Sequence, residues 1–84
     1  MDEISDLQAQ TIALRLAVEG VWLSLLRSDP NAVAEVERLR RENVAAVAQL
    51  PVPTAAAGAV RDAVARHTDQ LWGSIAWQLE HPER

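Results

Sequence analysis

Apolar residues recur at helical spacing in three segments of this chain, and two short stretches interrupt the pattern. We predict helices over about residues 3–27, 30–50 and 55–80. The interruptions read SDPN and LPVPT, and both are short enough that consecutive helices should run antiparallel. The prediction is therefore an all-α fold, a three-helix up-down-up bundle or hairpin, in one domain formed by all 84 residues.

The interrupting stretches carry recognisable helix boundaries. Asp29 can cap the second helix, and Pro30 suits a first helical position because proline has no amide hydrogen to lose. Pro51 disfavours helical backbone at the residue before it, and Thr54 can cap the third helix. These signals predict sharp boundaries on both sides of the second helix.

The first helix carries two sets of apolar positions. One set alternates between spacings of three and four residues, which is typical of coiled-coil packing, and we call it the heptad seam. The heptad seam consists of Ile4, Leu7, Thr11, Leu14, Val18, Val21 and Leu25. The second set lies on another side of the helix and consists of Ile12, Leu16, Leu23 and Leu26. From Ile12 onward the helix is therefore apolar nearly all round, apart from Arg15 and Glu19, which could pair with each other.

An all-round apolar helix needs more cover than two neighbouring helices can give. A second chain is the simplest source, so we predict a homodimer that packs through helix 1. The expected interface consists of Ile12, Leu16, Gly20, Leu23 and Leu26. Gly20 would let two backbones approach closely. Two alternatives are a different protein partner on the same surface and a monomer with an exposed apolar patch.

The other two helices carry one apolar stripe each. The stripe of the second helix consists of Val33, Val36, Leu39, Val44, Val47 and Leu50, and that of the third of Val60, Val64, His67, Leu71, Ile75 and Leu79. We predict that His67 is buried, neutral and hydrogen-bonded, and that Arg40 lies at a solvated edge. On the second helix, Glu37–Arg41 and Arg38–Glu42 have the spacing of surface ion pairs.

Three tryptophans and one arginine are the candidate contacts for a partner or ligand. If helices 1 and 3 run parallel, their C-terminal ends meet and Trp22 lies at the level of Trp72 and Trp77. We expect Trp22 and Trp72 to pack in the core, whereas Trp77 lies off the stripe and suits an interface. Arg15, within the apolar helix, could bind an anion. His81 should contact carbonyl groups at the end of its helix.

Composition and charge argue against several kinds of partner and site. The chain has a net charge of −4 and lacks cysteine, so a nucleic-acid partner, a disulfide and a thiolate metal site are not expected. The acidic start MDEISD does not resemble a signal peptide, and charged residues interrupt the longest apolar window. We expect a cytoplasmic protein with no membrane contact, no metal and no cofactor. No grouping of residues indicates a catalytic site.

Part of the first helix resembles a known enzyme family. Leu14–Arg15, Glu19 and the pair Leu25–Leu26 are spaced as in the first helix of the helical chorismate mutases, and SDPN is similar to the start of that family's second helix. The resemblance covers about the first forty residues and implies a small helical dimer with an active site between helices. That family uses several cations, including a lysine, around a dicarboxylate. This chain has no lysine, and only Arg15 lies in the matching region.

The sequence therefore predicts a non-enzymatic helical module for dimerisation and protein interaction. One alternative is a regulatory dimer that binds a small molecule in an apolar pocket at its interface. The other is a small all-helical enzyme of the kind that the resemblance implies.

Overall fold

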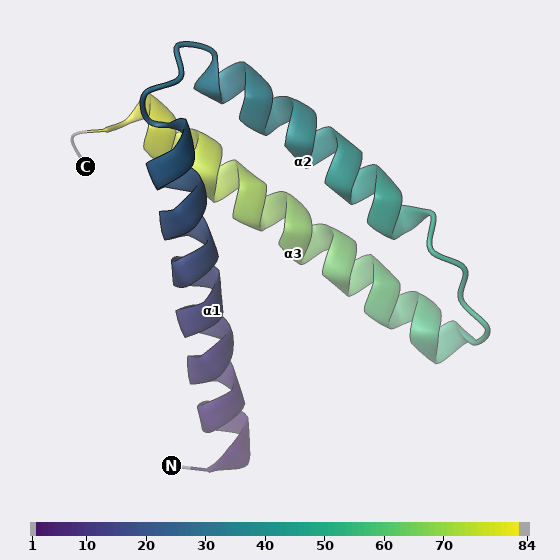
Figure 1. The fold of residues 1–84 in the computed structure, drawn as a ribbon. Coiled ribbons are helices and arrows are strands. Elements are labelled where there is room, and N and C mark those ends of the chain that lie inside the picture. The colour runs from purple at the N-terminus through teal and green to yellow at the C-terminus, as the bar shows by residue number, and fades with distance from the viewer. Residues whose placement is uncertain (1, 83–84) are drawn as a thin grey trace.

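The computed structural model describes residues 2–82, which form three helices and no strand (Figure 1). Helix α1 spans Glu3–Leu26, α2 spans Ala32–Ala48 and α3 spans Ala55–Glu80. This confirms the prediction of an all-helical chain with three helices. The second helix is shorter than predicted at both ends.

Side-chain caps explain where the helices begin. Asp2 accepts a hydrogen bond from the backbone N–H of Ser5 at 2.7 Å, and this bond lowers the pKa of the Asp2 carboxyl. Thr54 accepts one from the N–H of Ala57 at 3.0 Å, as predicted. Asp29 instead accepts from the N–H of Asn31 at 2.8 Å, which closes a turn before the helix. That turn moves the start of α2 to Ala32.

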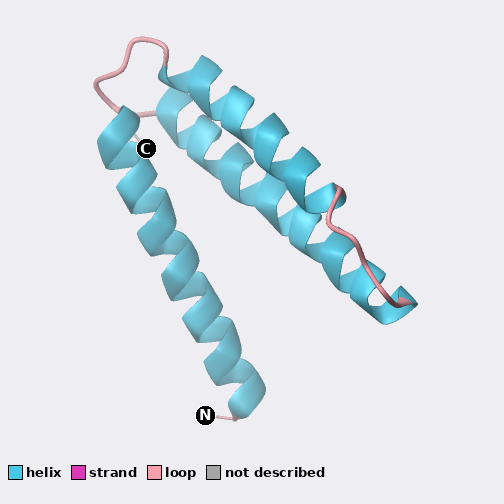
Figure 2. Ribbon diagram, turned by 45° about the vertical axis from the view of Figure 1, so that its right-hand side comes forward, coloured by secondary structure: helices cyan, strands magenta, loops and turns pink. Residues whose placement is uncertain are grey.

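Helices α2 and α3 form a closely packed antiparallel hairpin, and α1 extends from it as an arm (Figures 1 and 2). Val36 of α2 and Ile75 of α3 are fully buried where the two helices meet. The buried apolar residues of the described chain are Leu23, Leu26, Ala32, Val36, Trp72, Ile75 and Ala76. The core therefore lies at the end of the molecule where all three helices come together.

A bidentate ion pair between Arg40 and Asp69 joins the middle of α2 to α3. Arg40 donates from Nε to Asp69 Oδ1 at 2.6 Å and from Nη2 to Asp69 Oδ2 at 3.1 Å. The prediction that Arg40 lies at a solvated edge was wrong, because the guanidinium crosses to the neighbouring helix. Gly73 lies directly beneath this guanidinium, and a Cβ atom there would be 3.2 Å from Arg40 Nη2. The pair lowers the pKa of the Asp69 carboxyl and raises that of the Arg40 guanidinium.

The remaining charges of α2 pair along its surface. Arg38 binds Glu42 at 2.8 Å, as predicted, and it also contacts Glu35 one turn earlier. The predicted Glu37–Arg41 pair was wrong. Glu37 instead lies 3.6 Å from Arg40, which is three residues later on the same helix.

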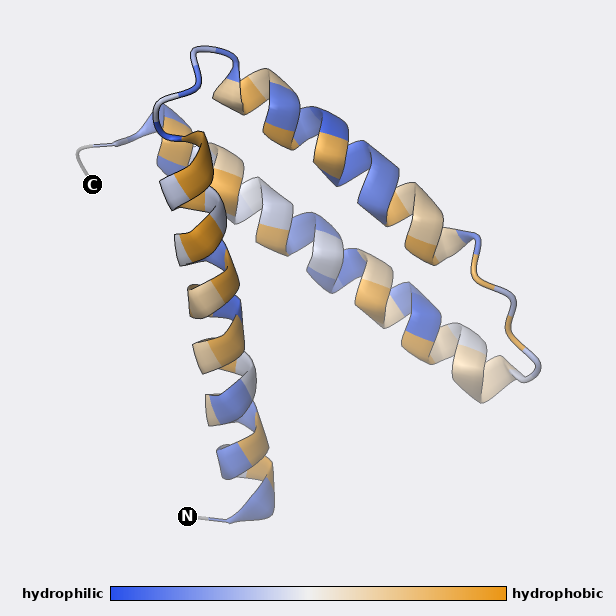
Figure 3. Ribbon diagram, in the orientation of Figure 1, coloured by the Kyte–Doolittle hydropathy of each residue, from blue (hydrophilic) through white to orange (hydrophobic). Residues whose placement is uncertain are grey.

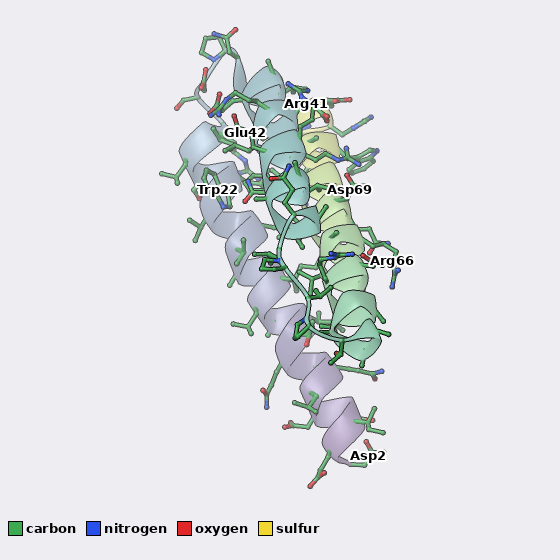
Figure 4. The ribbon with its side chains drawn as sticks, turned by 90° about the vertical axis from the view of Figure 1, so that its right-hand side faces the viewer. Asp2, Trp22, Arg41, Glu42, Arg66 and Asp69 are labelled. Carbon is green, nitrogen blue, oxygen red and sulfur yellow. The ribbon has the colours of Figure 1, made fainter. Side chains whose placement is uncertain are left out.

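Only the C-terminal half of α1 packs against the hairpin. Trp22 and Trp72 lie with their ring centroids 5.1 Å apart, which confirms that the C-terminal ends of α1 and α3 meet. The first buried residue along the chain is Glu19, and none of residues 2–18 is buried. Figure 4 shows Trp22 beside the hairpin and Asp2 at the far end of α1. The N-terminal half of α1 thus diverges from α3, so that the two helices together form a V shape that opens toward their N-terminal ends.

The result is an open, flat molecule. Its dimensions are 43 × 36 × 16 Å and its radius of gyration is 14.9 Å. A compact chain of this length would have a radius of gyration of about 12 Å. The thinnest dimension is close to the diameter of one or two helices, so much of each helix has no second layer above it.

Candidate functional site

The heptad seam of α1 is an exposed apolar surface. Apart from Thr11, its exposed fractions run from 40% at Val18 to 70% at Ile4, with Leu14 at 68%. Apolar residues are spread almost evenly around α1. In the view of Figure 3, orange is more frequent toward the C-terminal end of α1 and blue toward its N-terminal end. Because α3 touches a different side of α1, the whole length of the heptad seam faces solvent.

The predicted interface residues divide into two groups. Leu23 and Leu26 are buried in the core of their own chain, beside Trp72. Leu16 is 61% exposed, Ile12 is exposed to a similar degree, and a Cβ atom added at Gly20 would meet nothing within 4 Å. The second apolar set therefore also leaves a surface uncovered, centred on Leu16. Within the chain itself, α2 and α3 do not supply that cover.

A groove of about 500 Å³ lies in the V between α1 and α3. Thr11 and Arg15 line it from α1, and α3 contributes Val60, Val64, His67 and Leu71. Its walls are mostly apolar. Within the described residues 2–82, Arg15 is the one arginine that lines the groove. The several converging cations that the chorismate mutase resemblance implies are thus not brought together at this groove.

His67 is exposed at this groove, so the prediction of a buried histidine was wrong. The stripe of α3 on which it lies is covered only near its C-terminal end, where Ile75 is fully buried. At the level of His67, α1 has already diverged from α3. The stripe's first half, including Val60 and Val64, remains exposed for the same reason.

Arg15 and Glu19 form an ion pair at the point where α1 leaves α3. The Glu19 carboxylate is buried, and its Oε1 lies 3.7 Å from Arg15 Nε without any hydrogen-bond partner. Arg15 also donates from Nη2 to the carbonyl oxygen of Gln70 at 3.4 Å, which links α1 to α3. Arg15 is therefore a structural link between the helices as well as a residue of the groove.

The tryptophans occupy two different environments. Trp72 is buried and Trp22 half-buried, with their rings inclined at 60°, which places both at the core. Trp77 is 49% exposed and stacks on the ring of His81 at 4.3 Å. His81 donates from Nδ1 to the carbonyl oxygen of Trp77 at 2.8 Å, in agreement with the predicted contact at the helix end. Trp77 thus presents a rigid apolar ring to solvent.

By length and composition, α1 is also apolar enough to cross a membrane, although core helices of soluble proteins and signal sequences meet the same criterion. Comparison with known proteins identifies no matching family model, no similar curated protein and no similar solved structure.

Proposed function

We propose that this chain is a non-enzymatic helical interaction module that acts as a homodimer, in which the exposed surface of α1 is covered by a second copy. The observation that carries this proposal is the amount of uncovered surface. The chain exposes 6173 Å², whereas a compact monomer of this mass would expose about 4,900 Å².

The excess of about 1,200 Å² per chain is the size of a dimer interface. Two copies that each buried this area would remove about 2,400 Å² in total, which falls in the range of obligate homodimers. The surface is also of the right kind, because the interfaces of such dimers resemble a hydrophobic core divided between two chains. Along α1, the exposed large hydrophobic side chains are all leucine, isoleucine or valine.

A protein partner suits α1 better than a lipid bilayer does. Arg15 and Glu19 lie near the middle of the helix, and each charge at the centre of a bilayer costs about 2.5–3.5 kcal/mol or more. These two charges already pair with each other, and Arg15 also donates a hydrogen bond to the carbonyl group of Gln70 on α3. The packing of Trp22 on Trp72 also holds the C-terminal half of α1 against the hairpin.

Light scattering at micromolar concentration tests the proposal. We expect a mass of twice the 9.2 kDa of one chain. A Leu14→Glu variant should be monomeric, because it places a charge in the middle of the exposed heptad seam without disturbing any buried contact of its own chain. Ala13→Glu adds the same charge at an exposed position outside the seam, and this control should remain dimeric.

A wild-type chain that stays monomeric and soluble at these concentrations would contradict the proposal. Flotation with phosphatidylcholine vesicles provides the second measurement, and stable co-flotation of the wild-type chain would favour insertion of α1 into a membrane instead. Loss of dimerisation in both glutamate variants would mean that the added charge itself, rather than the seam, is responsible.

The groove supports a second candidate function, a dimer that binds a small molecule. Its volume of about 500 Å³ lies in the range of ligand pockets, and Arg15 and His67 are polar groups beside apolar walls. An apolar anion such as anilinonaphthalene sulfonate is a suitable fluorescent probe. Ala63→Trp would fill the groove, so saturable binding that this variant abolishes while it remains dimeric would support the function.

A further inference from the structure

We infer that the two copies pair with their α1 helices antiparallel along the heptad seam. This inference rests on the proposed homodimer and adds the orientation of the partner. Because the seam alternates between three- and four-residue spacing along its whole length, it presents a similar row of side chains in both directions. In the antiparallel pair, Leu7 of one copy lies opposite the region of Val18 and Val21 of the second copy.

The shape of the protomer favours this orientation. The C-terminal half of each α1 already carries its own α2–α3 hairpin, whereas the N-terminal half contacts no other part of its chain closely enough to be buried (Figure 2). A parallel pair would bring both hairpins to the same end and leave the two N-terminal halves to cover only each other. In an antiparallel pair, the free half of each α1 lies along the supported half of the other.

The groove between α1 and α3 lies beside the seam. Thr11 belongs both to the heptad seam and to the lining of the groove between α1 and α3. A helix that follows the seam therefore also passes along the edge of this groove. There it can cover part of the exposed stripe of α3, where Val60 and Val64 are 63% and 45% exposed. In the antiparallel register given above, the middle of the second copy's α1, around Leu14, passes that position.

Charge distribution along α1 is the second reason for antiparallel pairing. Asp2, Glu3 and Asp6 make the N-terminal end acidic, and the exposed Arg27 follows directly after the C-terminal end. A parallel pair would place both sets of three carboxylates side by side. Antiparallel pairing separates them and brings each set toward Arg27 of the second copy. The helix dipoles then also lie with opposite ends adjacent, which is the favourable arrangement.

Cysteine cross-linking tests the orientation, since the chain contains no cysteine of its own. Leu7→Cys protein is unfolded and refolded together with Val18→Cys protein, and separately with Val21→Cys protein. After mild oxidation, mass spectrometry identifies the disulfide-linked species. A disulfide requires Cα atoms about 4.4–6.8 Å apart, so only neighbours across the interface should react.

We expect a mixed disulfide between position 7 and position 18 or 21, at least about tenfold more abundant than the species linked through two copies of residue 7. Ala13→Cys, at an exposed position outside the seam, is the matched control and should give no enriched product. A predominant link between two copies of Leu7→Cys would show parallel pairing and overturn the inference. Dimers that form no disulfide in either mixture would also overturn it.

Light scattering of the reduced cysteine variants distinguishes the two levels of failure. These substitutions replace exposed side chains and leave the core of the chain intact. If the reduced variants and the wild-type chain are all monomers, the proposed dimer fails together with the orientation. If they are dimers that cross-link in the parallel sense, only the orientation fails.

Discussion

Glu19 is the one charged residue that is buried in the described part of the chain. Its side chain is buried where α1 meets α3, and Oε1 lies 3.7 Å from Arg15 Nε without a hydrogen-bond partner. A buried carboxylate oxygen that lacks a hydrogen bond loses its hydration without full compensation. Such pairs often fix the geometry of a fold more than they stabilise it.

Removing Arg15 should therefore be more harmful than removing both charges. Arg15→Ala leaves the Glu19 carboxylate buried and alone, and we expect it to lower the free energy of unfolding by about 1–3 kcal/mol, since the arginine is partly exposed to solvent. The double variant Arg15→Ala/Glu19→Leu should recover most of this loss. Urea denaturation at one protein concentration measures both. A double variant less stable than Arg15→Ala would show that the carboxylate contributes favourably.

Gly20 tests which side of α1 meets the second copy. It lies in the interior of a helix, and a Cβ atom there would touch nothing. Gly20→Ala should raise the free energy of unfolding by about 0.8–1 kcal/mol through helix propensity alone. Because Gly20 is not part of the heptad seam, the dimer dissociation constant should remain unchanged in sedimentation equilibrium. A weaker dimer would instead place Gly20 at a close contact between two backbones.

At the scale of elements, α2 and α3 are held by both packing and charge, whereas α1 is held mainly at one end. Val36 and Ile75 fill the space between α2 and α3, and the Arg40–Asp69 pair connects their middles. Helix α1 is joined to α3 by the Trp22–Trp72 contact and by the link from Arg15. We therefore expect α1 to be the first helix to detach when the fold is weakened.

The Arg40–Asp69 pair predicts a dependence of stability on pH. Hydrogen bonds from Arg40 lower the pKa of Asp69 below its ordinary value of 3.8. The carboxylate therefore contributes stability that is present above pH 3.8 and is lost as the pH falls through the lower pKa of the folded state. Asp69→Asn should remove this part of the acid sensitivity. Thermal unfolding followed by circular dichroism between pH 2 and 6 measures it, and identical pH profiles for the two proteins would contradict the assignment.

At the scale of the whole molecule, the small core makes association part of folding. Seven apolar residues are buried in the described chain, and all of them lie near the junction of the three helices. A chain of this length has few other sources of stability, since it has no disulfide. A second copy that covers α1 would add buried apolar surface that a single chain does not contain.

Thermal stability should therefore depend on protein concentration. Mass action favours the folded dimer, so the Tm of the wild-type chain should rise as the concentration increases from about 1 to 100 µM. The Leu14→Glu variant should show a lower Tm that does not change with concentration. Differential scanning calorimetry provides the measurement. A wild-type Tm independent of concentration would mean that α1 needs no second copy.

The positions of individual helices were accessible from the sequence because their causes are local. Capping by Thr54 and the ion pair Arg38–Glu42 depend on residues three or four positions apart, and both were predicted correctly. The environments of His67 and Arg40 were not predicted correctly. Each environment depends on the neighbouring helix. At the level of His67, α1 has diverged from α3, so the histidine is exposed at the groove. Arg40 of α2 pairs with Asp69 of α3, which is 29 residues away in the sequence.

The number of helices, the breaks between them and the nearly all-round apolar character of α1 could be predicted without the structure, because spacing and capping act within a few residues. Which of those apolar residues the chain itself covers depends on how its helices pack. Leu23 and Leu26 enter the core, whereas Leu14 and Leu16 stay exposed. The difference arises from the angle at which α1 leaves α3, and that angle is set by contacts such as Trp22–Trp72 between residues 50 positions apart.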